Sequence, residues 1–113
     1  MAIFYKNAGF LLTTTNLTTV LAINSSSVAI VKEIAITNKG STTAHLDMYV
    51  YSAGDTTNYQ FINANVPAAY NDNAAQTVLN LEQGDAILAQ TSTASVITGV
   101  ISYALLDRVG SNG

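Results

Sequence analysis

Cysteine and tryptophan are absent from this chain of 113 residues, which contains one proline and one histidine. Without cysteine there can be no disulfide, no thiolate metal ligand and no thiol nucleophile. A histidine-rich metal site needs two or three imidazoles at fixed spacing, and His45 stands alone. We therefore expect no metal and no cofactor.

Charge is also scarce, at 10% of the residues and a net charge of −3. The cationic residues stand singly, at Lys6, Lys32, Lys39 and Arg108. A phosphate backbone is bound by several clustered cations, so we expect no nucleic-acid partner. The apolar runs fall short of the roughly 18 residues of a membrane span, and the N-terminal segment lacks the pattern of a secretory leader. These features predict no membrane partner and synthesis in the cytoplasm.

What the chain has instead is apolar residues in alternation with polar ones. In the segment 44–51, Leu46, Met48 and Val50 share one side. The opposite side carries His45, Asp47, Tyr49 and Tyr51. This period of two predicts a strand with one buried face.

Two further segments have a stronger apolar character. Residues 28–36 carry aliphatic side chains on both parities, broken at Lys32, which predicts a strand covered on both faces over part of its length. Residues 96–106 are rich in β-branched residues, with Ile97, Ile101, Tyr103 and Leu105 on one parity. Gly99 inside this segment indicates a bulge or a close backbone approach.

The remaining strand signals are weaker. We expect short strands at 3–6 and 10–14 around a turn at 7–9, and others at 17–23, 58–64, 77–81 and 86–90. Pro67 should begin a loop that continues to residue 75, and Gly84-Asp85 should form a hairpin turn. About eight short strands predict an all-β antiparallel sandwich, for which a jelly roll is one available strand order.

We expect one domain, 1–113, as its length indicates. Residues 1–28 are expected to form an extra strand or an arm that reaches a neighbouring subunit. Residues 107–113, which end in Gly-Ser-Asn-Gly, are expected to be an exposed tail.

Catalytic patterns are hard to assemble from these residues. Glu82 and Asp85 could be proposed as paired carboxylates for acid–base chemistry, but they flank a turn in which Asp and Gly are preferred for backbone reasons. No serine lies in a G-x-S-x-G elbow. We therefore predict that the protein is not an enzyme.

The candidate interface residues are Tyr49, Tyr51, His45, Lys32 and Glu33. Tyrosines that face away from a core are enriched at protein interfaces, although internal packing, ordinary surface and stacking on a ligand remain alternatives. Lys32 and Glu33 are consecutive, so we expect them to point to opposite faces of their strand, each able to meet a charge across a strand or a subunit boundary.

Three segments carry a resemblance to a known class of protein. They are Val31–Asn38 followed by Gly40-Ser41, the Leu81–Ile87 segment with its Gly84-Asp85 turn, and Ile101-Ser102-Tyr103. Together they resemble the small β-sandwich virion proteins of tailed bacteriophages, over about residues 29–106. The resemblance implies location in the virion, partnership with the major capsid protein or other virion proteins, and no catalytic residues.

The resemblance leaves the place on the virion open. A capsid decoration (cement) protein is the leading expectation, because weak contacts repeated in a homo-oligomer such as a trimer or ring give firm attachment through avidity. A neck, tail or baseplate accessory protein is the alternative within the same class. A carbohydrate-binding receptor-recognition module is an alternative of another class, in which Tyr49, Tyr51, Tyr59 or Tyr70 would stack on a sugar.

Overall fold

The computed structural model describes residues 2–73 and 78–107, and in this part of the chain all regular structure is β-strand. No helix in these residues is long and apolar enough to span a bilayer. The strands are β1 (Ala2–Leu11), β2 (Thr18–Ala22), β3 (Ser27–Asn38), β4 (Ala44–Ser52), β5 (Thr57–Val66), β6 (Tyr70–Asn73), β7 (Leu79–Leu81), β8 (Ala86–Thr91) and β9 (Ile97–Asp107).

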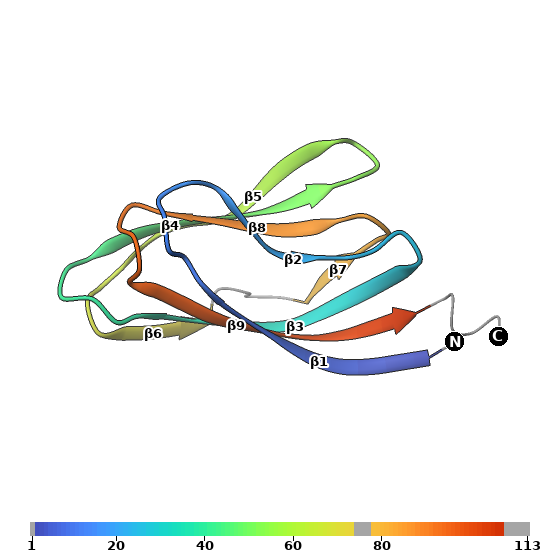
Figure 1. Ribbon diagram of the computed structural model, residues 1–113, viewed down its shortest axis with the longest axis horizontal. Coiled ribbons are helices and arrows are strands. Elements are labelled where there is room, and N and C mark those ends of the chain that lie inside the picture. Colours follow the sequence, from blue (N-terminus) through green and yellow to red (C-terminus); the bar gives the residue numbers. More distant parts are fainter. Residues whose placement is uncertain (1, 74–77, 108–113) are drawn as a thin grey trace.

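The strands form two antiparallel sheets packed face to face (Figure 1). Sheet A has the order β1-β9-β3, with β6 and β7 both pairing with β3 along its far edge, and sheet B has the order β2-β8-β4-β5. The chain passes from one sheet to the other at most of its connections. This is the jelly-roll order, and it confirms the predicted antiparallel β-sandwich.

The core lies between the central strands of the two sheets. On β4 the side chains of Leu46 and Met48 are fully buried, as the alternation predicted. They belong to one apolar cluster with Ile97 and Ile101 of β9. Burial of one face of each sheet is the main source of stability of such a two-layer fold.

A β-bulge in β3 changes which residues of that strand face the core. The pairing with β9 shifts between Val31 and Glu33, so Lys32 is the extra residue and the inward parity changes there. Val31 is buried before the bulge and Ile34 after it. The prediction that β3 is covered on both faces over part of its length is wrong for the single chain, because Ile30 on the outer side remains exposed.

The first strand is longer than expected. β1 pairs with β9 without interruption from Ala2 to Leu11, so the predicted turn at residues 7–9 is wrong. Phe10 lies opposite Gly99, and a Cβ atom built at Gly99 would meet the Phe10 Cζ at 2.3 Å and the Ala35 carbonyl oxygen at 3.0 Å. Gly99 is therefore a close approach, and the pairing runs through it without a bulge.

Two predicted connections also differ from the structure. Gly84-Asp85 joins β7 of sheet A to β8 of sheet B, so it is a crossing between the layers and not a hairpin turn. The expected loop from Pro67 to residue 75 contains β6, which pairs with β3. Most of the expected exposed tail, residues 108–113, lies outside the described residues.

Asn38, at the end of β3, links backbone segments at one end of the sandwich through side-chain hydrogen bonds. Its side chain is fully buried and all its polar atoms are occupied. Nδ2 donates to the carbonyl oxygens of Thr42 and Val66, and Oδ1 accepts from the Gly40 amide, each at 2.9 Å. The connection from sheet A to sheet B is thereby tied to the end of β5.

We predict that Gly99→Val destabilises the protein by about 1–3 kcal/mol, the usual cost of overpacking. The new side chain must displace the Phe10 ring, which packs partly buried against the core. Chemical denaturation followed by tyrosine fluorescence gives the free energy of unfolding.

Gly54→Ala is the matched control, because nothing lies within 4 Å of a Cβ atom at that turn position. Its free energy of unfolding should remain within about 0.5 kcal/mol of the wild type. Equal stability of the two variants would contradict the close approach at Gly99.

Candidate interaction surfaces

The outer face of sheet B carries the row that alternates with the buried side of β4. His45, Asp47, Tyr49 and Tyr51 are all partly exposed on it. β4 lies between β8 and β5, so the row runs along the middle of a sheet and not along its edge. The structure thus places the two tyrosines outside the core, and their role as an interface stays a prediction.

A hydrogen-bond network holds the first half of this row. His45 Nδ1 lies 2.8 Å from Asn65 Oδ1, and His45 Nε2 lies 3.1 Å from Asp47 Oδ1. Gln60 Nε2 donates to the same Asp47 oxygen at 2.8 Å. Because an acceptor faces each ring nitrogen, the doubly protonated imidazolium is the form that satisfies both contacts.

The pKa of His45 is accordingly raised above its ordinary value of 6.5. The hydrogen bond with Asn65 is the largest cause, partial desolvation opposes it, and the charge and hydrogen bond of Asp47 add to the increase, with a smaller contribution from Asn63. A raised pKa in the folded state means that protonated His45 favours folding below pH 6.5, and that this contribution is lost as the pH rises through the folded-state pKa.

Lys32 and Glu33 lie on the outer side of sheet A, both exposed. The expectation that they point to opposite faces is wrong, because the bulge at Lys32 interrupts the alternation. Lys32 Nζ lies 5.3 Å from the centre of the Tyr5 ring, a cation–π contact worth about 0.5–1 kcal/mol at an exposed site.

Beside this contact lies an apolar surface that sequence reasoning missed. Residues directly opposite each other in antiparallel strands share a face. The pairings place Ile3, Leu106 and Val28 in one row across three strands, and Tyr5, Ala104 and Ile30 in the next. We call these six residues the sheet A patch.

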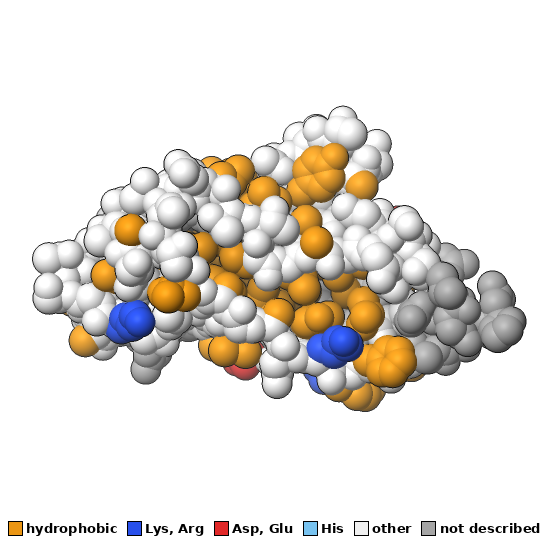
Figure 2. All heavy atoms as spheres, in the orientation of Figure 1, with side chains coloured by type: hydrophobic (Ala, Val, Ile, Leu, Met, Phe, Trp, Pro, Cys, Tyr) orange, Lys and Arg blue, Asp and Glu red, His pale blue; other side chains and the backbone are white. Residues whose placement is uncertain are grey.

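Several side chains of the sheet A patch are open to solvent. Tyr5 is 76% exposed, Ile3 55% and Ile30 38%. Figure 2 shows hydrophobic side chains gathered near the start of β1, close to a cationic side chain, and others visible between the two sheets. The sequence signal for the patch was the apolar character of both parities before Lys32, which alone did not show which face the partner sheet leaves uncovered.

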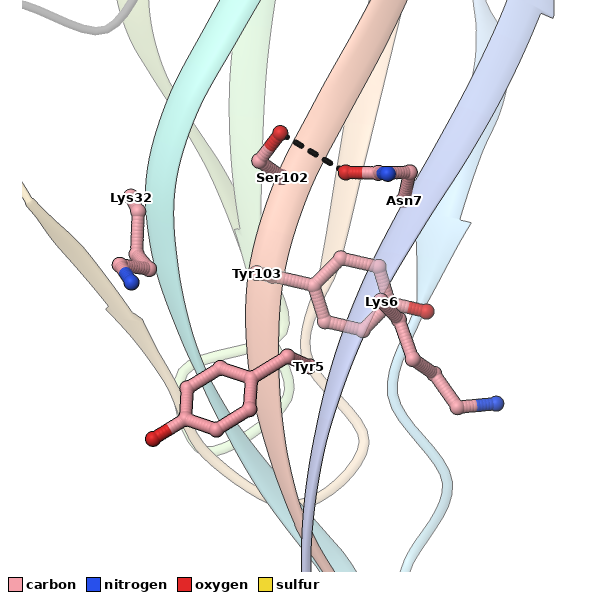
Figure 3. A pocket seen from close by; sticks show the side chains of 6 residues that line it. All are labelled: Tyr5, Lys6, Asn7, Lys32, Ser102 and Tyr103. Atoms are coloured by element: carbon pink, nitrogen blue, oxygen red, sulfur yellow. Dashed lines mark hydrogen bonds between the residues drawn. The ribbon is translucent and has the colours of Figure 1, made fainter.

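A small hollow of about 150 Å³ adjoins the sheet A patch, lined by Tyr5, Lys6, Asn7, Lys32, Ser102 and Tyr103 (Figure 3). In it, Ser102 Oγ donates to Asn7 Oδ1 at 2.9 Å across the β1–β9 pairing. The Lys6 side chain extends away from Lys32, which leaves the latter beside the Tyr5 ring. The hollow therefore places the Lys32 cation beside the Tyr5 ring, next to an aliphatic surface.

Glu82 and Asp85 do not form an acid–base pair. The Asp85 side chain is buried, with Oδ1 accepting from the Ala53 amide and Oδ2 accepting from the Glu82 amide, both at 2.9 Å. Its carboxylate thus joins the β4–β5 turn to the β7–β8 crossing. Within residues 2–73 and 78–107 there is no group of three or more His, Asp or Glu side chains that could hold a metal ion.

No family model matches this sequence, and no curated protein matches it either. Solved structures do match by fold. A chain from the T13 viral particle of infectious bursal disease virus (IBDV) superposes with a TM-score of 0.57 at 11% identity, over 96% of this chain and 32% of that one. This chain thus spans about a third of the length of the IBDV chain.

Two other matches have nearly the length of this chain. A chain from the acid-stable capsid of Helicobacter pylori bacteriophage KHP30 has a TM-score of 0.52 and 16% identity, over 94% of this chain and 88% of that one. A chain from the disulfide-linked pili of Bacillus endospore appendages has a TM-score of 0.56 and 14% identity, with the same coverage. The chain therefore has a β-sandwich of the kind found in viral capsids, and at these identities the likeness concerns the fold alone.

The single histidine allows a direct test of the network on β4. In an NMR titration, the His45 ring signals should give a pKa above 6.5, and Asn65→Ala and Asp47→Asn should each move it down toward 6.5. Asn80→Ala, on β7 of the other sheet, should leave it unchanged. A wild-type value at or below 6.5 would contradict the geometry.

Asp85→Ala should lower the free energy of unfolding by about 2–4 kcal/mol, because two hydrogen bonds to a charged group are lost. Asp55→Ala removes an exposed carboxylate that, among the described residues, accepts a hydrogen bond only from Tyr59 Oη, at 2.9 Å, and it should change stability by no more than about 0.5 kcal/mol. Thermal and urea unfolding of both variants distinguish the two positions.

Proposed function

We propose that this protein is a non-enzymatic structural component of a virion, and specifically a capsid decoration protein of a bacteriophage. In this role the sheet A patch attaches to the shell formed by the major capsid protein, and repetition of the contact over the shell stabilises it. Each copy contributes a modest affinity, which the symmetry of the particle multiplies.

The observation that carries this proposal is the uncovered outer face of β3. A strand with aliphatic residues on both parities is typical of strands that are covered on both sides. Here sheet B covers Ala29 and Val31, while Ile30 on the other face remains exposed beside Tyr5. Exposed apolar surface of this kind marks protein interaction sites, so a partner outside the chain would complete the burial.

The likeness in fold to the phage KHP30 capsid chain supports a structural role in a virion. Both chains consist almost entirely of the one sandwich, whereas the IBDV chain contains this fold as about a third of its length.

A homo-oligomer is part of the proposal. β1 is an edge strand of ten residues in sheet A, and unpaired backbone groups at an edge favour pairing with another strand. Residues 1–28 would then contribute to the contact between copies through β1, while the Ile30 side of the sheet A patch faces the shell. Copy number per particle distinguishes decoration from a neck or tail position. A decoration protein is present in numbers that match the shell subunits, whereas a neck or tail component is present only as a few rings.

The test of attachment uses empty shells of the virus that encodes the protein and the purified chain. The double variant Tyr5→Ser/Ile30→Ser should weaken co-sedimentation with shells by at least about tenfold, or ~1.4 kcal/mol. Both side chains are exposed, so the melting temperature should change little.

Tyr59→Ser is the matched control, because Tyr59 is 52% exposed on β5 of the opposite sheet. It should bind shells as the wild type does. The proposal fails if the double variant binds with unchanged affinity, or if the wild-type protein stays monomeric and binds neither shells nor tails.

A further inference from the structure

A second hollow, of about 290 Å³, lies on the outer face of sheet B and has a different chemical character. It is lined by Thr15, His45, Asp47, Gln90, Thr91 and Ser92. All six side chains are polar, and they come from β4, from β8 with the turn after it, and from the loop before β2. The two sheets pack against each other through their inner faces, so this hollow and the sheet A patch lie on opposite sides of the sandwich (Figure 1).

The walls of this hollow are held in place by hydrogen bonds. Gln90 Nε2 donates to the Thr15 carbonyl oxygen at 3.1 Å. Ser92 N donates to the His45 carbonyl oxygen at 3.0 Å, and His45 N donates to Ser92 Oγ at 2.9 Å. Asp47 Oδ1 is already fixed by Gln60 and His45. A site whose polar groups are held in advance loses little entropy when a ligand binds.

Other polar atoms in the hollow have no partner among the described residues. Asp47 Oδ2 and Gln90 Oε1 accept no hydrogen bond there, and the hydroxyl groups of Thr15 and Ser92 donate none. Asp47 and Gln90 lie directly opposite each other on β4 and β8, so their Cβ atoms are about 5 Å apart. The hollow thus offers two acceptors side by side and two hydroxyl donors near them.

From this arrangement the geometry points to a binding site for a neutral saccharide. A sugar presents neighbouring hydroxyl groups that both donate and accept, which matches a carboxylate and an amide oxygen beside two hydroxyls. The carboxylate of Asp47 disfavours an anionic ligand. The volume of about 290 Å³ lies just below the usual range for small-molecule sites, so the hollow suits a small saccharide.

An aromatic side chain flanks the same site. Tyr49 follows Asp47 by two residues on the same face of β4, about 6.8 Å further along the strand. It is partly exposed and stands next to the hollow without lining it, so the inference includes stacking of its ring on the apolar face of a sugar that extends from Asp47 along β4. A decoration protein held by the sheet A patch would present this hollow outward, which would add recognition of a glycan to its structural role.

The experiment uses the purified full chain and requires no shells, so its outcome is independent of the proposed attachment. Glucose, galactose, mannose and N-acetylglucosamine are each titrated into ¹⁵N-labelled protein while amide and His45 ring signals are followed by NMR. At least one sugar should give saturable shifts at residues 15, 45–47 and 90–92, with a Kd near 1 mM (about −4 kcal/mol). A glycan array extends the search to larger saccharides.

Asp47→Asn and Gln90→Leu should each raise the Kd by about tenfold, equivalent to ~1.4 kcal/mol, while Asp55→Asn, outside the hollow, should leave it unchanged. The two variants at the site guard against the failure of either one to fold. Absence of saturable shifts and of array binding would overturn the inference. Binding that survives both Asp47→Asn and Gln90→Leu would overturn it as well.

Discussion

The burial of one face of each sheet against the other is the interaction on which the rest of this structure depends. It requires every central strand to present an apolar side inward, and β4 and β9 do so by simple alternation, with Leu46, Met48, Ile97 and Ile101 in the core. β3 does so only because a bulge at Lys32 changes its inward parity. The side chains that face outward on each strand are therefore determined by which side chains the core requires to face inward.

Two buried polar side chains close the sandwich without disturbing its apolar interior. Asn38 binds two backbone groups of the β3–β4 connection and one at the end of β5, and Asp85 binds one in the β4–β5 turn and one at the β7–β8 crossing. Each satisfies backbone groups at turns and strand ends, and such hydrogen bonding is the condition for burying a polar side chain at low cost. The sequence alone allowed Asp85 to be considered as a catalytic carboxylate, but its hydrogen bonds give it a structural role.

The outer faces of sheet A and sheet B differ in chemistry. Sheet A presents aliphatic and aromatic side chains around Tyr5 and Ile30, with Lys32 beside them. Sheet B presents a network of His45, Asp47 and Asn65 next to a polar hollow. A domain with an apolar outer face on one sheet and a polar outer face on the other is suited to attach to a larger assembly through the apolar face. This is consistent with the proposed role in a virion.

The sequence by itself determined the all-β class, the antiparallel sandwich, the inward residues of β4 and β9, and the outward row from His45 to Tyr51, because alternation is local and needs no knowledge of pairing. The tertiary structure alone decided that residues 7–9 continue a strand, that Gly84-Asp85 crosses between sheets, and that Lys32 and Glu33 share a side. It alone also brought Ile3 and Tyr5 beside Ile30. These features arise from register between strands that are far apart in the chain, and register is fixed by long-range packing that a local pattern does not contain.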